Sequence, residues 1–182
     1  MVLLYCGGIS MFRQATIHDL DAICAIYDAI HTQEEAGITT IGWIRSVYPT
    51  RQTAKLAIEK EDMFVLEAEG RVVACGRINQ EQVDCYQDGN WKYEAKEQDV
   101  MVLHTLVVDP AKSRMGYGAQ FLTFYEAFAK EHDCPYLRID TNARNTRARA
   151  FYQKNGYWEV GSVPCVFNGI PGVELILLEK KV

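Results

Sequence analysis

A strand followed by a glycine-containing turn and a helix is the feature that most constrains what this chain can fold into. Residues 100–108 are apolar at almost every position, which is typical of a strand buried on both faces. A short basic loop follows, and Gly116 and Gly118 open a helical segment at 117–131. Glycine lacks a Cβ atom, so a ligand can approach the backbone N–H groups closely. Because the first turn of a helix has free N–H groups and a favourable dipole, this turn predicts a phosphate site.

The charge of this turn contrasts with the charge of the whole chain. The 182 residues include 24 Asp and Glu against 19 Lys and Arg, a formal net charge of −5. Lys112 and Arg114 nevertheless lie at the turn. A local cationic patch on an acidic protein indicates a specific polyphosphate ligand, not a general affinity for nucleic acid. Taken alone, the two glycines are equally compatible with a tight strand-to-helix turn that binds nothing.

Length and cysteine usage limit the class of protein. A chain of 182 residues with 48% hydrophobic residues is large enough for one domain with a proper core. Its six cysteines include no C-x-x-C pair, which fits neither a zinc site nor a disulfide framework. No apolar stretch approaches the ~20 residues of a membrane span. We therefore expect a cytoplasmic protein with free thiols and no membrane or nucleic-acid partner.

The remaining pattern predicts one mixed α/β domain with a parallel βαβ crossover at its centre. We expect residues 1–10 to be a peripheral extension, because Met11 begins a good opening strand, and 11–182 to be the domain. Residues 79–99 show no clear pattern apart from Trp91 and Tyr93. The expected strands are 11–15, 63–67, 71–78, 100–108, 136–140, 158–167 and 173–179, and the expected helices are 20–30, 43–48, 50–59, 117–131 and 145–155.

A second motif lies in the helix expected at 145–155. Asn145, Ala148 and Tyr152 are spaced i, i+3 and i+7, so they share one helical stripe. The small Ala148 between two polar side chains leaves room for a ligand along that face. Tyr152 is also compatible with an ordinary core aromatic. Three arginines add positive charge nearby: Arg144, Arg147 and Arg149.

Together the two motifs resemble those of the GNAT superfamily of acyl-CoA-dependent N-acetyltransferases. Its phosphate-loop pattern, Arg/Gln-x-x-Gly-x-Gly/Ala, aligns with Ser113 to Gly118, with serine in place of the usual Arg or Gln. Its later pattern, Asn-x-x-Ala-x-x-x-Tyr-x-Lys-x-Gly-aromatic, is met at every fixed position from Asn145 to Tyr157. The order of elements is also similar over nearly the whole chain. The resemblance implies a mixed twisted sheet of about seven strands flanked by about four helices.

The resemblance also implies the donor substrate and its site. Acetyl-CoA would lie between two parallel strands that splay apart, here 100–108 and 136–142. Its pantetheine arm would pair with the first of these strands, and its pyrophosphate would bind residues 113–118. The implied binding residues are Leu106, Val107, Val108, Ser113, Arg114, Met115, Gly116, Tyr117, Gly118, Asn145, Ala148 and Tyr152.

The implied reaction is direct attack of a primary amine on the thioester in a ternary complex, with no metal. An amine with a pKa near ~10.4 must first lose a proton, at a cost of roughly 4.6 kcal/mol at pH 7. His104 is a candidate base, although a histidine in an apolar strand is more often a hydrogen-bonded core residue. Tyr152 is the candidate acid that protonates the leaving thiolate. Glu34 and Glu35 either attract the amine or form a solvated helix end.

The acceptor itself is not specified by the sequence, because similar scaffolds acetylate small-molecule and peptide amines alike. Trp91 and Tyr93 either cover the acceptor site or hold the long loop to the surface. The resemblance also makes a homodimer through the C-terminal strands an expectation. Two other functions stay open: a non-catalytic acyl-CoA-binding module, and a nucleotide-binding domain, although the Gly-Lys-Ser/Thr ending of an ATP-binding P-loop is missing.

Overall fold

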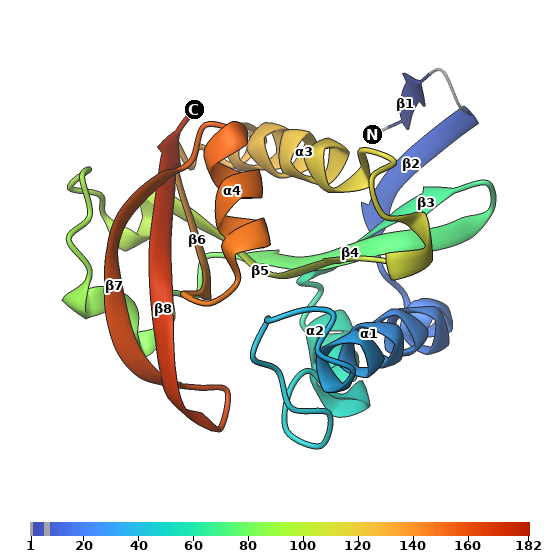
Figure 1. Ribbon diagram of the computed structural model, residues 1–182. Helices are drawn as coiled ribbons and strands as arrows, with labels where there is room; N and C mark the ends of the chain where they lie inside the picture. Colours follow the sequence, from blue (N-terminus) through green and yellow to red (C-terminus); the bar gives the residue numbers. More distant parts are fainter. Residues whose placement is uncertain (1, 6–7) are drawn as a thin grey trace.

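The protein is a single mixed sheet between two layers of helices (Figure 1). A computed structural model describes the backbone of residues 2–5 and 8–182 and the side chains from Ser10 onward. The described strands form one eight-stranded sheet in the order β1-β2-β3-β4-β5-β6-β8-β7. They are β1 (Val2–Tyr5), β2 (Gly8–Gln14), β3 (Met63–Ala68), β4 (Arg71–Asn79), β5 (Val100–Val108), β6 (Tyr136–Asn142), β7 (Trp158–Phe167) and β8 (Ile170–Lys181).

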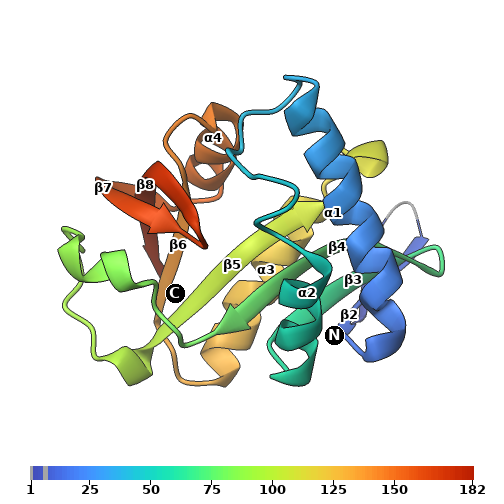
Figure 2. The same ribbon diagram turned by 90° about the horizontal axis from the view of Figure 1, so that it is seen from below.

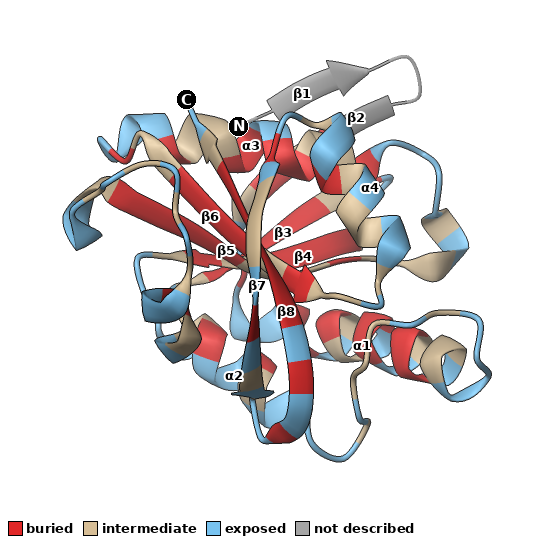
Figure 3. Cartoon of the chain, turned by 60° about the vertical axis from the view of Figure 1, so that its left-hand side comes forward, coloured by how far each residue is buried: buried red, intermediate tan, exposed pale blue. Residues whose placement is uncertain are grey.

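Four α-helices cover the two faces of the sheet. They are α1 (Leu20–Glu35), α2 (Arg51–Glu59), α3 (Tyr117–Glu131) and α4 (Thr146–Lys154). In Figures 1 and 2, α1 and α2 cover one face, and α3 and α4 cover the other. Phe121, Leu122 and Tyr125 of α3 pack on one side of the central strands, and Ile23 and Ile26 of α1 pack on the opposite side. Buried residues are therefore concentrated in the central strands (Figure 3).

Most of the predicted elements are confirmed, and so is the sheet of about seven strands with four helices, to which β1 adds an edge strand. Residues 16–19 form a capping box before α1, in which the Thr16 N–H donates to Asp19 Oδ2 at 2.8 Å. A three-residue 3₁₀ turn, Ile17–Asp19, precedes α1 there. Gly156 adopts the left-handed conformation after α4, with φ +85°.

The prediction of a helix at 43–48 is wrong. This segment forms a single turn, in which the N–H groups of Val47 and Tyr48 both donate to the Ile44 carbonyl. Its two aromatic residues pack against each other: the ring centroids of Trp43 and Tyr48 lie 6.1 Å apart, edge to face. A proline also disfavours the helical conformation for the residue before it, and Tyr48 precedes Pro49.

The segment 79–99 contains two 3₁₀ turns, Asp84–Asp88 and Glu97–Asp99. Trp91 holds this segment to the sheet: its indole N–H donates to the Tyr86 carbonyl at 2.7 Å, and the Arg138 guanidinium lies 4.0 Å from its ring. Of the predicted extension, residues 1 and 6–7 lie outside the described part, and β1 pairs antiparallel with β2 at the edge of the sheet. That residues 1–10 are peripheral remains a prediction.

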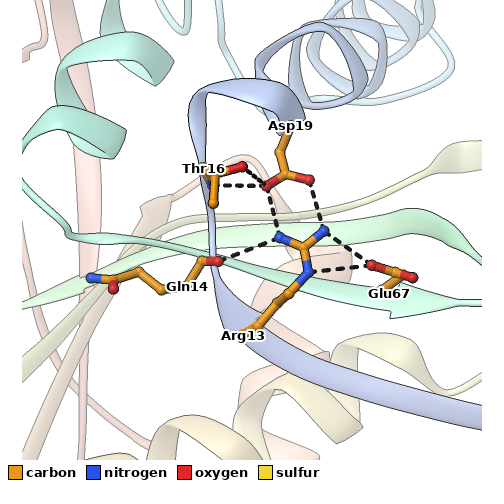
Figure 4. A network of polar contacts seen from close by, with 5 residues as sticks. All are labelled: Arg13, Gln14, Thr16, Asp19 and Glu67. Atoms are coloured by element: carbon orange, nitrogen blue, oxygen red, sulfur yellow. Dashed lines mark hydrogen bonds and ion pairs between the residues drawn. The ribbon is translucent and has the colours of Figure 1, made fainter.

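An ion-pair network fixes the start of α1 to the sheet (Figure 4). The Arg13 guanidinium, on β2, donates to both oxygens of Asp19 at 2.7 and 2.8 Å and to Glu67 Oε2 at 3.0 and 3.2 Å. Asp19 precedes α1, and Glu67 lies on the neighbouring strand β3. The Arg13 side chain therefore joins β2 and β3 to the start of α1. The C-terminal half of α1 contributes Ile30 and Gln33 to the lining of a cavity.

Candidate active site

The two parallel strands β5 and β6 diverge beyond a short paired stretch (Figure 2). Only Val100–Leu103 of β5 pair with Tyr136–Ile139 of β6. Beyond this point β6 stays with β8, and β5 stays with β4. A cavity of about 1030 Å³ fills the gap, lined by both strands, α4, the loop before α3 and the loop after α1.

A β-bulge aims the second half of β5 at this cavity. Arg77 of β4 pairs with His104, but Cys75 pairs with Val107, so β5 contains one extra residue. Thr105 takes up the distortion with φ +54°. Thr105 and Leu106 have no partner in the β4–β5 register. Thr105 and all three following residues line the cavity, as the resemblance implied for Leu106, Val107 and Val108.

The predicted phosphate loop forms one end of the cavity. The N–H groups of residues 114–119 have no hydrogen-bond partner within the part of the chain that the structure describes. Gly116 has φ +81°, where a side chain would strain the backbone. At Gly118, an added Cβ would lie 3.1 Å from the Phe151 ring of α4. This loop, residues 113–118, which we call the anion loop, therefore combines unpaired backbone N–H groups with close packing of α3 against α4.

Positive charge gathers at this end. Lys112 and Arg114 line the cavity from the loop, and Arg147 and Lys154 line it from α4. Arg149 is engaged elsewhere, because its guanidinium binds Glu159 at 2.7 and 2.8 Å.

The second motif lies along the cavity wall. Asn145 precedes the first helical residue of α4, and its Oδ1 accepts from the Ala148 N–H at 3.1 Å. Ala148 and Tyr152 also line the cavity. Tyr152 is buried, and its hydroxyl makes no hydrogen bond to any described residue. Burial, and then the nearby Asp140 carboxylate, raise the pKa of Tyr152, so this hydroxyl keeps its proton at neutral pH.

The structure adds a residue that the sequence analysis missed. Asp140 lies on β6, one residue beyond the last β5–β6 pair, and lines the cavity. The Tyr86 hydroxyl donates to its Oδ2 at 2.7 Å. Burial raises the pKa of Asp140 to about 6 despite this bond. The available signal was its place at the carboxyl end of a predicted parallel strand, where α/β proteins bind ligands.

All the predicted site residues line the cavity except His104 and Met115. The Met115 side chain is exposed. The ring nitrogen Nε2 of His104 lies 2.9 Å from the side-chain oxygen Oδ1 of Asn79, which is the last residue of β4. Burial, together with the charge of Arg77, lowers the pKa of His104 to about 4, so its ring is neutral at pH 7. The role of His104 as a base remains a prediction.

Glu34 and Glu35 have partners within the protein. The Glu34 carboxylate accepts from the N–H groups of Ile41 and Gly42, both at 2.8 Å, and from the Thr39 hydroxyl at 3.0 Å. Glu35 binds the Arg45 guanidinium at 2.8 Å. Glu34 therefore fixes the loop of residues 38–43, which we call the α1–α2 loop and which lines the cavity.

Two further findings concern the described residues alone. No group of three His, Cys, Asp or Glu side chains among them is arranged to hold a metal ion. None of the helices that they form has both the length and the apolar character to cross a membrane.

A mixed sheet that splits at a parallel strand pair, with an anion loop beside the split, is the architecture expected of an acyl-CoA-dependent transferase. The sequence matches the Acetyltransferase (GNAT) family over residues 23–157. The chain therefore belongs to the GNAT family and is an acetyltransferase. Members of this family generally use acetyl-CoA and act on amine acceptors.

Solved structures share this fold. A GNAT-family acetyltransferase from Streptococcus agalactiae aligns with a TM-score of 0.78 and 19% identity over 95% of each chain. One from Listeria monocytogenes gives 0.75 and 20% identity over 100% of each chain. A ribosomal-protein-alanine N-acetyltransferase from Brucella melitensis gives 0.69 and 21% identity, over 94% of this chain and 99% of that chain. None of the curated protein sequences matches the chain significantly.

Proposed function

We propose that this enzyme transfers an acetyl group from acetyl-CoA to a primary amine by direct attack within a ternary complex. The observation that carries the proposal is one cavity lined by three features: the anion loop, the buried hydroxyl of Tyr152 and the carboxylate of Asp140. A phosphate-bearing donor and a proton donor and acceptor can therefore act in the same space. The acceptor is a small-molecule or peptide amine. A cytoplasmic location and a homodimer remain predictions.

The residues at the loop fit the phosphates of the donor. Unpaired N–H groups at 114–119 offer several hydrogen bonds to a pyrophosphate, and Lys112 and Arg114 add charge. Because most of these donors belong to the backbone, Ser113 need not supply a charged side chain. Asn145 uses Oδ1 to cap α4, which leaves its Nδ2 group for the pantetheine arm. The unpaired backbone at Leu106 would pair with the same arm.

We assign acceptance of the amine proton to Asp140. A carboxylate with a pKa of about 6 is ionised at neutral pH and is closer to the optimum for a base than an ordinary aspartate. It also attracts the cationic form of the amine. His104 is neutral and is the alternative base, but it does not line the cavity.

Tyr152 is the proton donor. As the amine nitrogen bonds to the acetyl carbon and the carbon–sulfur bond breaks, the Tyr152 hydroxyl gives its proton to the departing sulfur. Asp140 first accepts the proton that the bound ammonium loses before attack and releases it to solvent. The nitrogen loses a second proton to Asp140 as the amide forms, and proton exchange with solvent restores both residues. The raised pKa of Tyr152 keeps its hydroxyl protonated until negative charge develops on the departing sulfur.

The proposal is tested by titration calorimetry followed by turnover. Acetyl-CoA is expected to bind with micromolar affinity, and ATP is not. Tyr152→Phe is expected to keep that affinity and lose about 100-fold in turnover, the usual contribution of a general acid. Tyr27→Phe is the matched control, because Tyr27 is also a buried tyrosine but does not line the cavity. Absence of acetyl-CoA binding would contradict the proposed function, and unchanged turnover would remove Tyr152 from the mechanism.

A further inference from the structure

Charge is divided between the two ends of the cavity. Its cationic side chains, on the loop before α3 and on α4, are Lys112, Arg114, Arg147 and Lys154. Among the described residues, Asp140 is the one carboxylate that lines the cavity, and it lies on β6. The phosphates of the donor account for the cationic end. The described residues that line the far end therefore offer a second ligand one negative charge and no positive charge.

Apolar side chains contribute to both walls of the far end, beside Thr39 and Thr40 of the α1–α2 loop. Ile38, Ile41 and Trp43 of the α1–α2 loop line it on one side, and Phe167 and Val173 of the β7–β8 hairpin line it on the other. A ligand between these walls would contact aliphatic and aromatic carbon on both sides. Such surroundings favour burial of an apolar ligand body.

The β7–β8 hairpin bounds the far end on one side. The Phe167 ring packs edge to face against Tyr48 at 5.6 Å, and an added Cβ at Gly169 would lie 3.3 Å from Val47. The hairpin tip therefore contacts the segment after the α1–α2 loop. Tyr48 in turn hydrogen-bonds to Thr105 at the bulge of β5. These contacts limit the length of the acceptor beyond the reacting amine.

We infer that the acceptor is a small monocationic primary amine that carries an aromatic or similarly sized apolar group and no carboxylate beside the amine. This inference rests on the proposed function and narrows its acceptor. An amino acid would bring its carboxylate next to Asp140, with no cation among the residues that line that end to pair with it. A polyamine would bring further cations that meet apolar walls. Both leave a charge desolvated and unpaired, which is costly.

Three acceptors separate these classes: 2-phenylethylamine, L-phenylalanine, which differs by one carboxylate, and spermidine, which has several cations and no ring. With acetyl-CoA as donor, release of CoA thiol gives kcat/KM, and mass spectrometry confirms the acetylated product. We expect 2-phenylethylamine to exceed each of the others by at least about 100-fold, as expected when a charge is left unpaired. A peptide with an N-terminal phenylalanine serves as a fourth acceptor.

Variants test the walls directly. Phe167→Ala is expected to raise KM for 2-phenylethylamine by about 10-fold, and to leave propylamine KM and acetyl-CoA affinity unchanged. Val166→Ala is the matched control, because Val166 is adjacent on β7 and 70% exposed. Equal or better turnover of phenylalanine, spermidine or the peptide overturns the inference but leaves the proposed function standing. An unchanged KM in Phe167→Ala also overturns it. If the wild type does not bind acetyl-CoA, that result contradicts the proposed function instead.

Discussion

At the scale of single residues, the site depends on a carboxylic acid and a phenol whose proton affinities are set by burial. Asp140 lies near enough to Tyr152 and Tyr48 for its charge to contribute to the raised pKa of both hydroxyls, after burial itself. Cys85 and Cys165 also have raised pKa values, to which burial and Asp140 contribute. Asp140 therefore lies near several hydroxyl and thiol groups that are neutral at pH 7, and it is the one carboxylate among the described residues that line the cavity. The nearby cation is Arg77, whose charge also acts on Tyr48.

This arrangement predicts a pH dependence. Because Asp140 must be ionised to accept a proton, kcat/KM of the wild type should fall about tenfold per pH unit below its pKa of about 6. Asp140→Asn should lower turnover by about 100-fold or more and remove this acidic limb. The measurement is a pH–rate profile of both proteins between pH 5 and 8. Retention of the limb in the variant would assign it to another group.

Stability provides the control for this variant. Burial disfavours the charged form of Asp140, so replacement by a neutral amide should not reduce thermal stability at pH 7 or 8. A large loss of stability would mean that the rate effect reflects misfolding. His104→Asn, which keeps a hydrogen-bonding side chain beside Asn79, tests the alternative base. If that variant alone loses the acidic limb, His104 is the base.

At the scale of elements, the α1–α2 loop takes its shape from one carboxylate. Glu34 accepts three hydrogen bonds from residues 39, 41 and 42 of the loop. Gly42 closes the loop against β6, since an added Cβ would lie 2.4 Å from Asn142 Nδ2. The loop is thus a preformed wall of the acceptor end.

Loss of that carboxylate should affect the acceptor and not the donor. Glu34→Ala should raise KM for the acceptor by about tenfold at unchanged acetyl-CoA affinity, because the misplaced wall lies away from the phosphate loop. Glu35→Ala is the matched control, because it removes an exposed ion pair with Arg45, and solvent screens such pairs strongly. Steady-state kinetics with both substrates would show the difference. An equal effect of both variants would contradict the role of Glu34.

The network that attaches α1 to the sheet predicts sensitivity to acid. Hydrogen bonds from Arg13 lower the pKa of Asp19 from 3.8 to about 2. A lowered pKa stabilises the fold at pH values above 3.8, and this contribution is lost as the pH falls through about 2. Asp19→Asn should therefore reduce the free energy of unfolding at pH 7 by about 2 kcal/mol.

Urea unfolding of both proteins at several pH values tests this expectation. The difference between wild type and Asp19→Asn should shrink between pH 4 and pH 2. Glu81→Gln, in an exposed pair with Lys60, is the control and should cost at most about 1 kcal/mol. A difference that does not change with pH would assign the loss to packing instead of charge.

At the scale of the whole molecule, the sheet consists of two halves joined by a short parallel ladder. The cavity lies between these halves, and its lining comes from both. A ligand that binds there contacts both halves and should stabilise the whole fold. Acetyl-CoA at 100 times its Kd should add about 2.7 kcal/mol and raise Tm by about 5–10 °C, whereas ATP should not. An equal shift with ATP would indicate a site that recognises nucleotides in general.

Local signals explain how much of this protein was predictable. The loop at Gly116, the cap at Asn145 and the capping box at Thr16 each depend on residues a few positions apart. Their geometry is therefore encoded in short stretches of sequence. The strand at 100–108 was equally clear from its continuous apolar run, and the helix at 117–131 from the regular spacing of its apolar residues.

Tertiary structure decided the rest, because long-range contacts give those residues their chemistry. Asp140 becomes a base candidate only where β5 and β6 separate and Tyr86, 54 residues away in sequence, binds it. The sequence indicated an acyl-CoA site but not this carboxylate. In the sequence, Glu34 is compatible with a solvated helix end, yet in the structure its carboxylate accepts hydrogen bonds that shape the α1–α2 loop. The fold and the donor site thus follow from local pattern, whereas the shape and charge of the acceptor site follow from packing between distant segments.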